Sequence, residues 1–307
     1  MVQIVECIPN ISEGRRPEVV EACVNQIRNT AGCILLDYSS DASHNRSVIT
    51  YAGSPEAVGE AGVRLVKKAA ELIDLTKQSG EHPRMGAVDV MPLVPIRGCT
   101  VSDCIALSEK TGKRIAEEAG VPVFLYEQSA KKKNRKNLAD IRQGQFEGMA
   151  EKVRRPEWEP DFGGRRIHPT AGVTAVGARP PLIAYNLNLD TGDVNIAKAI
   201  AKTVREKDGG LKCVKALGFE ITDDKTGRKF AQVSMNMTNF RETSLYEITE
   251  RVKVEAAKYG AVIKEAELIG LCPAEAFAET AAEYLKIKDF NYRTQVLEEV
   301  LSGKSAE

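Results

Sequence analysis

The residue type best suited to proton transfer is scarce in this chain. Among its 307 residues only three are histidines, His44, His82 and His168. Imidazole has an unperturbed pKa near neutrality, so it can take up and release protons. His82 follows Glu81, and an apolar run begins at Ala87. We interpret His82 as an imidazole in a short loop at the start of a buried strand, where it is either catalytic or an ordinary surface histidine.

Three other segments concentrate polar or charged side chains. Residues 41–47 are typical of an ordinary turn, but an Asn-Arg pair before a strand also suits a carboxylate ligand. Residues 161–172 contain glycines that allow close approach to a flat ligand, or that form a flexible linker. The basic block at residues 131–136 is either a solvated loop or a region that attracts an anionic ligand.

Composition and local patterns disfavour several classes of protein. Lys+Arg and Asp+Glu both number 43, which disfavours a globally basic nucleic-acid binder. The predicted strand at residues 230–237 lacks the aromatic residues with which an RRM stacks on RNA. Seven cysteines without a CxxC pair predict reduced thiols, no metal site and a cytoplasmic location. Residues 1–13 do not resemble a signal peptide, and no apolar run is long enough to cross a membrane.

Predicted elements follow the order β-α-β-β-α-β twice, which is typical of a ferredoxin-like unit. The first copy comprises residues 2–7, 17–28, 33–37, 46–51, 55–73 and 87–96, followed by a helix at 102–119 and a strand at 121–126. The second comprises residues 182–188, 193–205, 213–220, 230–237, 244–258 and 261–271, with a turn at 223–227 and further helices at 274–284 and 294–301.

We therefore expect an α/β (α+β) fold of two ferredoxin-like βαββαβ subdomains, residues 1–179 and 180–307, with facing mixed sheets and outer helices. Residues 158–181 are predicted to connect them as a long segment that contacts ligand. A cleft between the subdomains is the expected ligand site.

Several runs, taken together and in order, resemble the formiminotransferase family over residues 1 to about 290. The most specific of them is Gly80-Glu81-His82-Pro83-Arg84-Met85-Gly86-Ala87-Val88-Asp89-Val90. The others are residues 5–14, 45–48, 160–163, 177–179 and 183–186.

The resemblance implies transfer of a formimino group from N-formimino-L-glutamate to N5 of tetrahydrofolate, as in histidine degradation. It implies that His82 is the catalytic histidine, and that the folate-contacting loop is Gly163, Gly164, Arg165, Arg166, Ile167, His168, Pro169, Thr170, Ala171 and Gly172. Arg165, Arg166, His168 and Thr170 differ from the animal pattern. Cyclodeamination is expected from a separate protein.

In such a transfer the folate nitrogen must lose a proton and the departing glutamate nitrogen must gain one, and a single imidazole can do both in turn. We expect His82 to do both, with Glu81 or Asp89 orienting its ring, and without a covalent enzyme intermediate. The other substrate-binding candidates are Asn45, Arg46, Arg84 and Arg179.

Two other functions stay open from the sequence. One is formyl exchange between glutamate and 5-formyltetrahydrofolate in the same site. The other is a non-catalytic folate- or RNA-binding ferredoxin-like protein. The expected partners are small-molecule substrates, formiminoglutamate and folate, with no nucleic acid and no membrane, and the chain is expected to form a homodimer.

Overall fold

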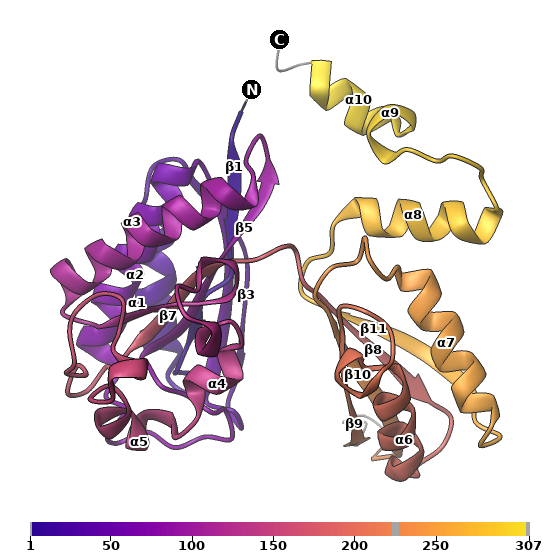
Figure 1. The fold of residues 1–307 in the computed structure, drawn as a ribbon, viewed down its shortest axis with the longest axis horizontal. Coiled ribbons are helices and arrows are strands. Elements are labelled where there is room, and N and C mark those ends of the chain that lie inside the picture. The colour runs from indigo at the N-terminus through magenta and orange to yellow at the C-terminus, as the bar shows by residue number, and fades with distance from the viewer. Residues whose placement is uncertain (1, 223–226, 305–307) are drawn as a thin grey trace. The chain divides into compact units, whose positions relative to one another are not determined.

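The computed structural model describes residues 2–222 and 227–304. Residues 223–226 of the predicted turn therefore lie outside the described part of the chain. The fold divides into two compact units, Met1–Arg179 and Pro180–Glu307 (Figure 1). Each unit has its own sheet and its own hydrophobic core.

The first unit is built on a seven-stranded mixed sheet with a ferredoxin-like centre. Because β1 and β2 each pair with both β4 and β5, they form one interrupted central strand. Antiparallel pairing joins β3, β4, β1 and β5, whereas β7 adds to β5 in parallel and β6 adds to β7. The strands are β1 (Ile4–Cys7), β2 (Asn10–Ile11), β3 (Cys33–Asp41), β4 (Arg46–Gly53), β5 (Val88–Arg97), β6 (Val123–Leu125) and β7 (Thr174–Ala178).

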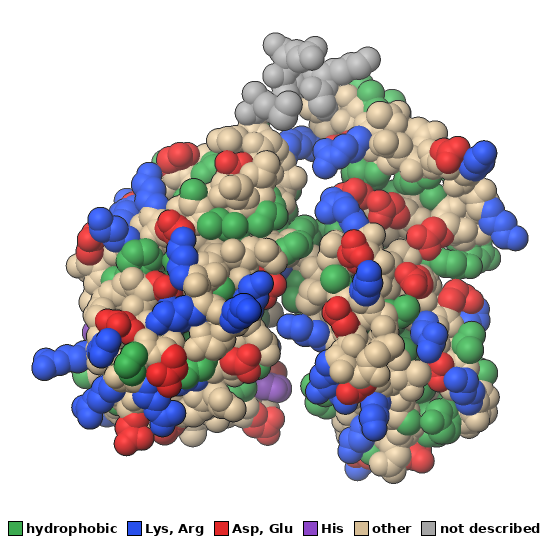
Figure 2. Space-filling model, in the orientation of Figure 1, with side chains coloured by type: hydrophobic (Ala, Val, Ile, Leu, Met, Phe, Trp, Pro, Cys, Tyr) green, Lys and Arg blue, Asp and Glu red, His purple; other side chains and the backbone are tan. Residues whose placement is uncertain are grey.

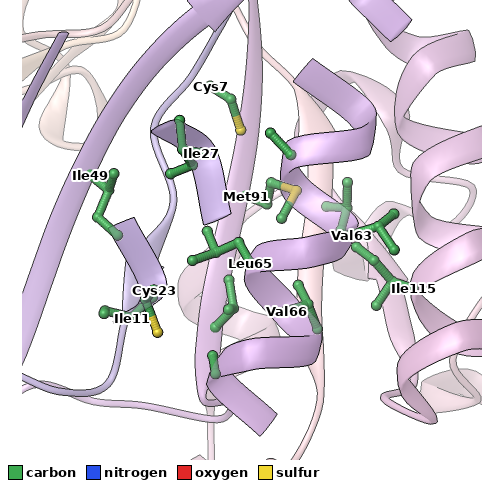
Figure 3. Close-up of a cluster of buried hydrophobic side chains, with 14 of the residues drawn as sticks. Cys7, Ile11, Cys23, Ile27, Ile49, Val63, Leu65, Val66, Met91 and Ile115 are labelled. Carbon is green, nitrogen blue, oxygen red and sulfur yellow. The ribbon is translucent and has the colours of Figure 1, made fainter. Parts of the chain in front are cut away.

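Three helices, α1 (Pro17–Arg28), α2 (Pro55–Leu72) and α3 (Val101–Ala119), cover one face of this sheet (Figure 1). Proline at the first position starts α1 and α2, and a Thr100–Asp103 capping box starts α3. Their apolar stripes interdigitate with strand side chains such as Met91 in a buried cluster (Figure 3). The predicted bounds of these helices agree with the structure to within one residue.

The opposite face of the sheet is covered, over β5, β6 and β7, by a segment for which the sequence predicted no elements. It contains α4 (Leu138–Arg142), α5 (Gln145–Lys152) and the short 3₁₀ turns η1 (Glu127–Ser129), η2 (Lys133–Arg135) and η3 (Pro156–Trp158). A second core cluster forms beneath it, because alternate residues along a strand point to opposite faces. That cluster is Met85, Val90, Phe124, Tyr126, Ile141, Met149, Val153, Val173 and Ala175.

Residues 158–181 were predicted as a connection without a strand, and the structure corrects this. This segment includes β7, whose five residues are all buried and which pairs with a strand on each side. Its small residues and the glycines around it are typical of linkers. Here they allow close packing, because a Cβ on Gly177 would lie 2.2 Å from the carbonyl oxygen of Tyr126.

The second unit repeats the ferredoxin-like order without the additional strands. Its sheet has the order β11-β8-β10-β9, and α6 and α7 pack against it. The prediction of a mixed sheet is wrong here, because every pairing is antiparallel: β9 and β10 form a hairpin, and β8 lies between β10 and β11. The elements are β8 (Ile183–Leu189), α6 (Val194–Val204), η4 (Glu206–Asp208), β9 (Val214–Thr222), β10 (Lys229–Met237), α7 (Leu245–Ala257) and β11 (Ile263–Ile269).

Three helices follow β11, namely α8 (Ala274–Leu285), α9 (Tyr292–Gln295) and α10 (Leu297–Lys304). The single helix predicted at residues 294–301 is therefore two, because Val296 has an extended backbone. No helix within the described residues is both long and apolar enough to cross a bilayer. On the face drawn in Figure 2, basic and acidic side chains are interspersed on both units.

Candidate active site

The strand directions bring three of the predicted polar segments to one edge of the first sheet. Strands β5, β6 and β7 are parallel, so their first residues lie at the same edge. Strand β4 also starts there, because both β4 and β5 pair antiparallel with β1. Arg46 begins β4, the His82 loop precedes β5, and residues 163–172 precede β7.

Backbone hydrogen bonds hold the His82 loop between its two neighbours. The His82 N–H donates to the His44 carbonyl over 3.4 Å, and the Ala87 N–H donates to the Ala171 carbonyl over 2.9 Å. Gly172 has a φ of +69°, and a Cβ there would lie 2.2 Å from the Met85 oxygen. Only glycine fits this crossing without strain. The loop is therefore fixed by contacts distant in sequence.

The His82 ring is buried, with 5% of the residue exposed. Its Nε2 lies 3.6 Å from Asp89 Oδ2, and this buried nitrogen has no hydrogen-bond partner among the described residues. Burial lowers the pKa of His82; Asp89 acts in the opposite direction, and the cations of Arg142 and Arg46 lower it further. The imidazole is therefore neutral at pH 7 and able to accept a proton.

Asp89 owes its orientation to a β-bulge. Asn10 of β2 pairs with Val90 and Ile11 pairs with Val88, so Asp89 is the extra residue. Such bulges re-aim side chains and are common beside active sites. The buried Asp89 carboxylate accepts a 2.8 Å hydrogen bond from the Met85 N–H.

A second group, Arg142, donates to Asp89 Oδ2 from Nε at 2.8 Å and from Nη2 at 2.5 Å. Burial by itself raises the pKa of the Asp89 carboxyl. His82, Arg142 and the Met85 N–H more than offset this effect, and the pKa lies below its ordinary value. Asp89 is therefore an ionised carboxylate beside the imidazole.

The structure distinguishes among the other predicted candidates. Glu81 is exposed, so Asp89 is the carboxylate next to the His82 ring. The Asn45 amide is used internally, because its Oδ1 accepts from the Gly14 N–H at 2.9 Å and its Nδ2 donates to the Ser79 carbonyl at 3.1 Å. Asn45 thus joins loops of the protein.

The three arginine candidates differ in their surroundings. Arg84 forms a 2.8 Å ion pair with Glu147 and fastens the His82 loop to α5. Arg46 makes no ion pair with any described residue, and its Nε is buried without a partner. Burial, with Arg142 nearby, lowers its pKa. Arg179 is at the opposite end of β7, where its N–H donates to the Leu93 carbonyl, so it is far along the strands from His82.

The predicted folate loop has two different halves. Residues 163–166 are exposed, with Gly163 and Gly164 at positive φ and Arg165 paired with Glu159 at 2.7 Å. In the second half, the His168 Nδ1 accepts from the Ala171 N–H at 3.0 Å and so closes a tight turn. That turn lies against the His82 loop through the backbone bonds at Ala87 and Ala171.

The basic block at residues 131–136 is not a wholly solvated loop, although four of its lysines are exposed. Arg135 is fully buried, pairs with Asp161 and lies 5.0 Å from the centre of the Phe124 ring. Lys131 pairs with Glu109, and Lys132 donates to the Pro156 carbonyl over 2.9 Å. Much of the block therefore fastens residues 127–136 to the body of the unit.

Arg142 is not among the residues predicted from the sequence. It belongs to a five-residue helix without a distinct periodicity, and its partner is 53 residues away in the sequence. The sequence contains one indirect indication of such a residue: Asp89 lies within an apolar run, and a buried carboxylate needs a cationic partner. Among the described residues, no group of three or more His, Cys, Asp or Glu side chains is arranged to hold a metal ion, and the seven cysteines are free.

Comparison with known proteins assigns both units. The family model for the Formiminotransferase domain, N-terminal subdomain, matches residues 4–179, and the model for the Formiminotransferase domain matches residues 184–300. A protein of Streptococcus pyogenes serotype M1 named Glutamate formimidoyltransferase is 52% identical over 303 residues, which cover 99% of this chain and all of that one.

Two further relatives support the same assignment. A Glutamate formimidoyltransferase of Thermoplasma acidophilum is 41% identical, covering 94% of this chain and 95% of its own length. A Formimidoyltransferase-cyclodeaminase of Dictyostelium discoideum is 42% identical over 93% of this chain, which spans only 53% of that longer protein. With both units matched and full-length relatives above 40% identity, the chain belongs to the formiminotransferase family.

Proposed function

We propose that this chain is a glutamate formimidoyltransferase, which moves the formimino group of N-formimino-L-glutamate to N5 of tetrahydrofolate. The observation that carries the proposal is the 52% identity, over 99% of the chain, to a relative with that name. The protein is thereby a one-carbon group transferase. The transferase names of its relatives do not favour a non-catalytic folate- or RNA-binding protein.

His82 is the proposed general base and acid. The folate nitrogen must lose a proton as it attacks the amidine carbon, and the glutamate nitrogen must gain one as it departs. A neutral imidazole can do both in turn. Nε2 faces Asp89, and Nδ1 forms no hydrogen bond with the described residues, which makes Nδ1 the nitrogen proposed to meet the substrates.

Arg46 is the proposed anchor for a carboxylate of the glutamate substrate. Its guanidinium is partly buried, begins β4 at the same sheet edge as His82, and has no carboxylate partner among the described residues. An arginine in that state gains most from a bound anion, because its fork of donors matches a carboxylate. The folate is proposed to contact the exposed glycines and arginines of residues 163–166, beside the turn closed by His168.

Turnover of formiminoglutamate with tetrahydrofolate tests this function. Wild-type protein is expected to form 5-formiminotetrahydrofolate, and His82→Gln to lower kcat by about 10²- to 10⁴-fold. His44→Gln is the matched control, since it removes another imidazole of the same unit, whose ring pairs with Asp41 at 2.8 Å. No product from the wild-type protein, or a His82→Gln variant as fast as His44→Gln, would contradict the proposal.

Formylglutamate in a parallel assay tests donor preference. The two donors differ by =NH against =O, and formiminoglutamate is expected to be the faster substrate.

A homodimeric state and a cytoplasmic location stay predictions. Light scattering on the purified protein and fractionation of the source cells test them.

A further inference from the structure

We propose that Arg142 is a positioning residue for His82 and acts on it through Asp89. Its role in turnover rests on the proposed function, whereas its effect on the His82 ring does not. Two nitrogens of the Arg142 guanidinium donate to Asp89 Oδ2, the carboxylate oxygen that faces the imidazole.

The carboxylate between them has no freedom to turn. Asp89 Oδ1 accepts from the Met85 N–H at 2.8 Å, and Oδ2 accepts from both Arg142 nitrogens. Contacts on both oxygens define the plane of the group. The imidazole is left against Oδ2 at 3.6 Å, longer than a hydrogen bond. Arg142 thus offsets the negative charge on the oxygen that would otherwise stabilise a protonated His82.

Arg142 is itself held by an unusual cap. The Lys152 Nζ donates to the carbonyl oxygens of Asp140, Ile141 and Gln143 at 2.6, 2.7 and 2.9 Å, on both sides of Arg142. The same ammonium lies 4.0 Å from the centre of the Trp158 ring. A helix as short as α4 is not stable alone, so this cap gives Arg142 a fixed base.

The charges around the ring make the consequence specific. Three charged groups act on His82: Asp89 raises its pKa, while Arg142 and Arg46 lower it. A base for the first proton transfer must be neutral when substrate binds. Without Arg142, Asp89 would be uncompensated, and the Asp89–His82 pair would take up a proton at higher pH.

A purely structural role for Arg142 is the competing explanation. It predicts a less stable protein in which His82 titrates as before. The positioning role predicts a change at His82 even in folded protein without substrate. Because the chain has only three histidines, their ring signals can be followed individually by NMR, and a His82→Gln spectrum assigns the signal of interest.

The decisive experiment compares Arg142→Gln, Arg142→Lys and Asp89→Asn. Arg142→Gln is expected to move the His82 titration to higher pH, and Asp89→Asn to move it to lower pH. Arg142→Lys keeps the charge but not the two-point geometry, so its titration should stay near that of the wild type. In turnover, Arg142→Gln should lower kcat by about 10²-fold, and Arg142→Lys should recover part of the loss.

Arg114→Gln is the matched control, because Arg114 also has two carboxylate contacts, at Glu60 and Glu118, but on α3. An unchanged His82 titration in Arg142→Gln, or an equal shift in Arg114→Gln, would overturn the inference. Should Arg142→Gln not fold, Lys152→Met provides a second test, because it removes the cap and leaves Arg142 in place. This variant is expected to move the His82 titration in the same direction as Arg142→Gln, by a smaller amount. An unchanged titration in Lys152→Met would also overturn the inference. If the His82 titration moves as expected but the wild-type protein does not turn over formiminoglutamate, the proposed function is refuted and the positioning role of Arg142 is not.

Discussion

The two units share a four-stranded ferredoxin-like core, and they differ in the residue that each places at the same position of that core. In the first, β5 bulges at Asp89 opposite β2. In the second, β11 bulges at Lys264, because Ile263 pairs with Leu189 and Glu265 with Asn188. Asp89 is fully buried between a histidine and an arginine, whereas Lys264 is exposed. The ferredoxin-like scaffold supplies the bulge but does not supply the chemistry.

The difference lies in the segments that join the scaffold strands. Residues 73–87 connect α2 to β5 in the first unit, while only residues 258–262 connect α7 to β11 in the second. The longer connection carries His82, and all three histidines belong to the first unit. Among the described residues of the second unit, no strand corresponds to β7 and no helices between the sheet strands correspond to α4 and α5. The proposed catalytic histidine therefore lies in an addition to a repeated frame.

Matched substitutions at the two bulges should give the largest difference in stability between the two units. Asp89→Asn leaves Arg142 without its carboxylate and is expected to lower the free energy of unfolding by about 3–5 kcal/mol. Lys264→Gln changes an exposed residue and should alter it by less than about 0.5 kcal/mol. Urea unfolding measures both, and equal losses would mean that the bulges are energetically equivalent.

One glycine at positive φ in each unit allows a second comparison of stability between the units. A Cβ on Gly172 meets the Met85 carbonyl, whereas Gly270 in the second unit has nothing within 4 Å. Gly172→Ala combines backbone strain with a clash and should cost about 2–4 kcal/mol. Gly270→Ala has the strain alone and should cost about 1 kcal/mol. Thermal unfolding of the two variants would contradict this if Gly270→Ala were the less stable.

Acid should affect the first unit before the second, because the pKa of both His82 and His168 is lowered by burial. A histidine with a depressed folded-state pKa binds fewer protons folded than unfolded. Its contribution to stability is therefore complete above about pH 6.5, the ordinary value, and declines as pH falls through the folded pKa.

Activity should follow the same direction, since kcat/KM needs neutral His82 and is expected to fall only below pH 6.5. A pH series of unfolding, with His82→Gln subtracted from wild type, measures the stability term. A difference that falls as the pH rises beyond 6.5 would show that the shift has the opposite sign.

The smallest effect is expected at the basic block. Lys131 is exposed, its pair with Glu109 is a surface contact, and Lys133 is also exposed. Replacing both by alanine should change stability by less than about 1 kcal/mol. The Michaelis constants for mono- and polyglutamylated folate should change equally. A selective rise for the polyglutamate would restore the block as an anion-attracting region.

Local patterns in the sequence were sufficient for most elements of both units. Helix α1 begins at Pro17 and ends at Arg28 as predicted, because proline placement and an apolar stripe are properties of the segment itself. Strand β7 was missed because Gly172 and Gly177 suggest a linker until their tight crossings are seen. The segment with α4 and α5 was missed because its helices are short and depend on tertiary contacts.

The sequence by itself determined the repeated order of elements, the family and His82 as the imidazole to examine. Only the tertiary structure decided that Asp89, and not Glu81, faces the ring, that Asn45 and Arg84 serve the fold, and that Arg142 completes the cluster. Periodicity reports whether one segment is buried, because that depends on its neighbours along the chain. The partner of a buried charge depends on strand register, on a bulge and on a residue 53 positions away, which no local pattern contains.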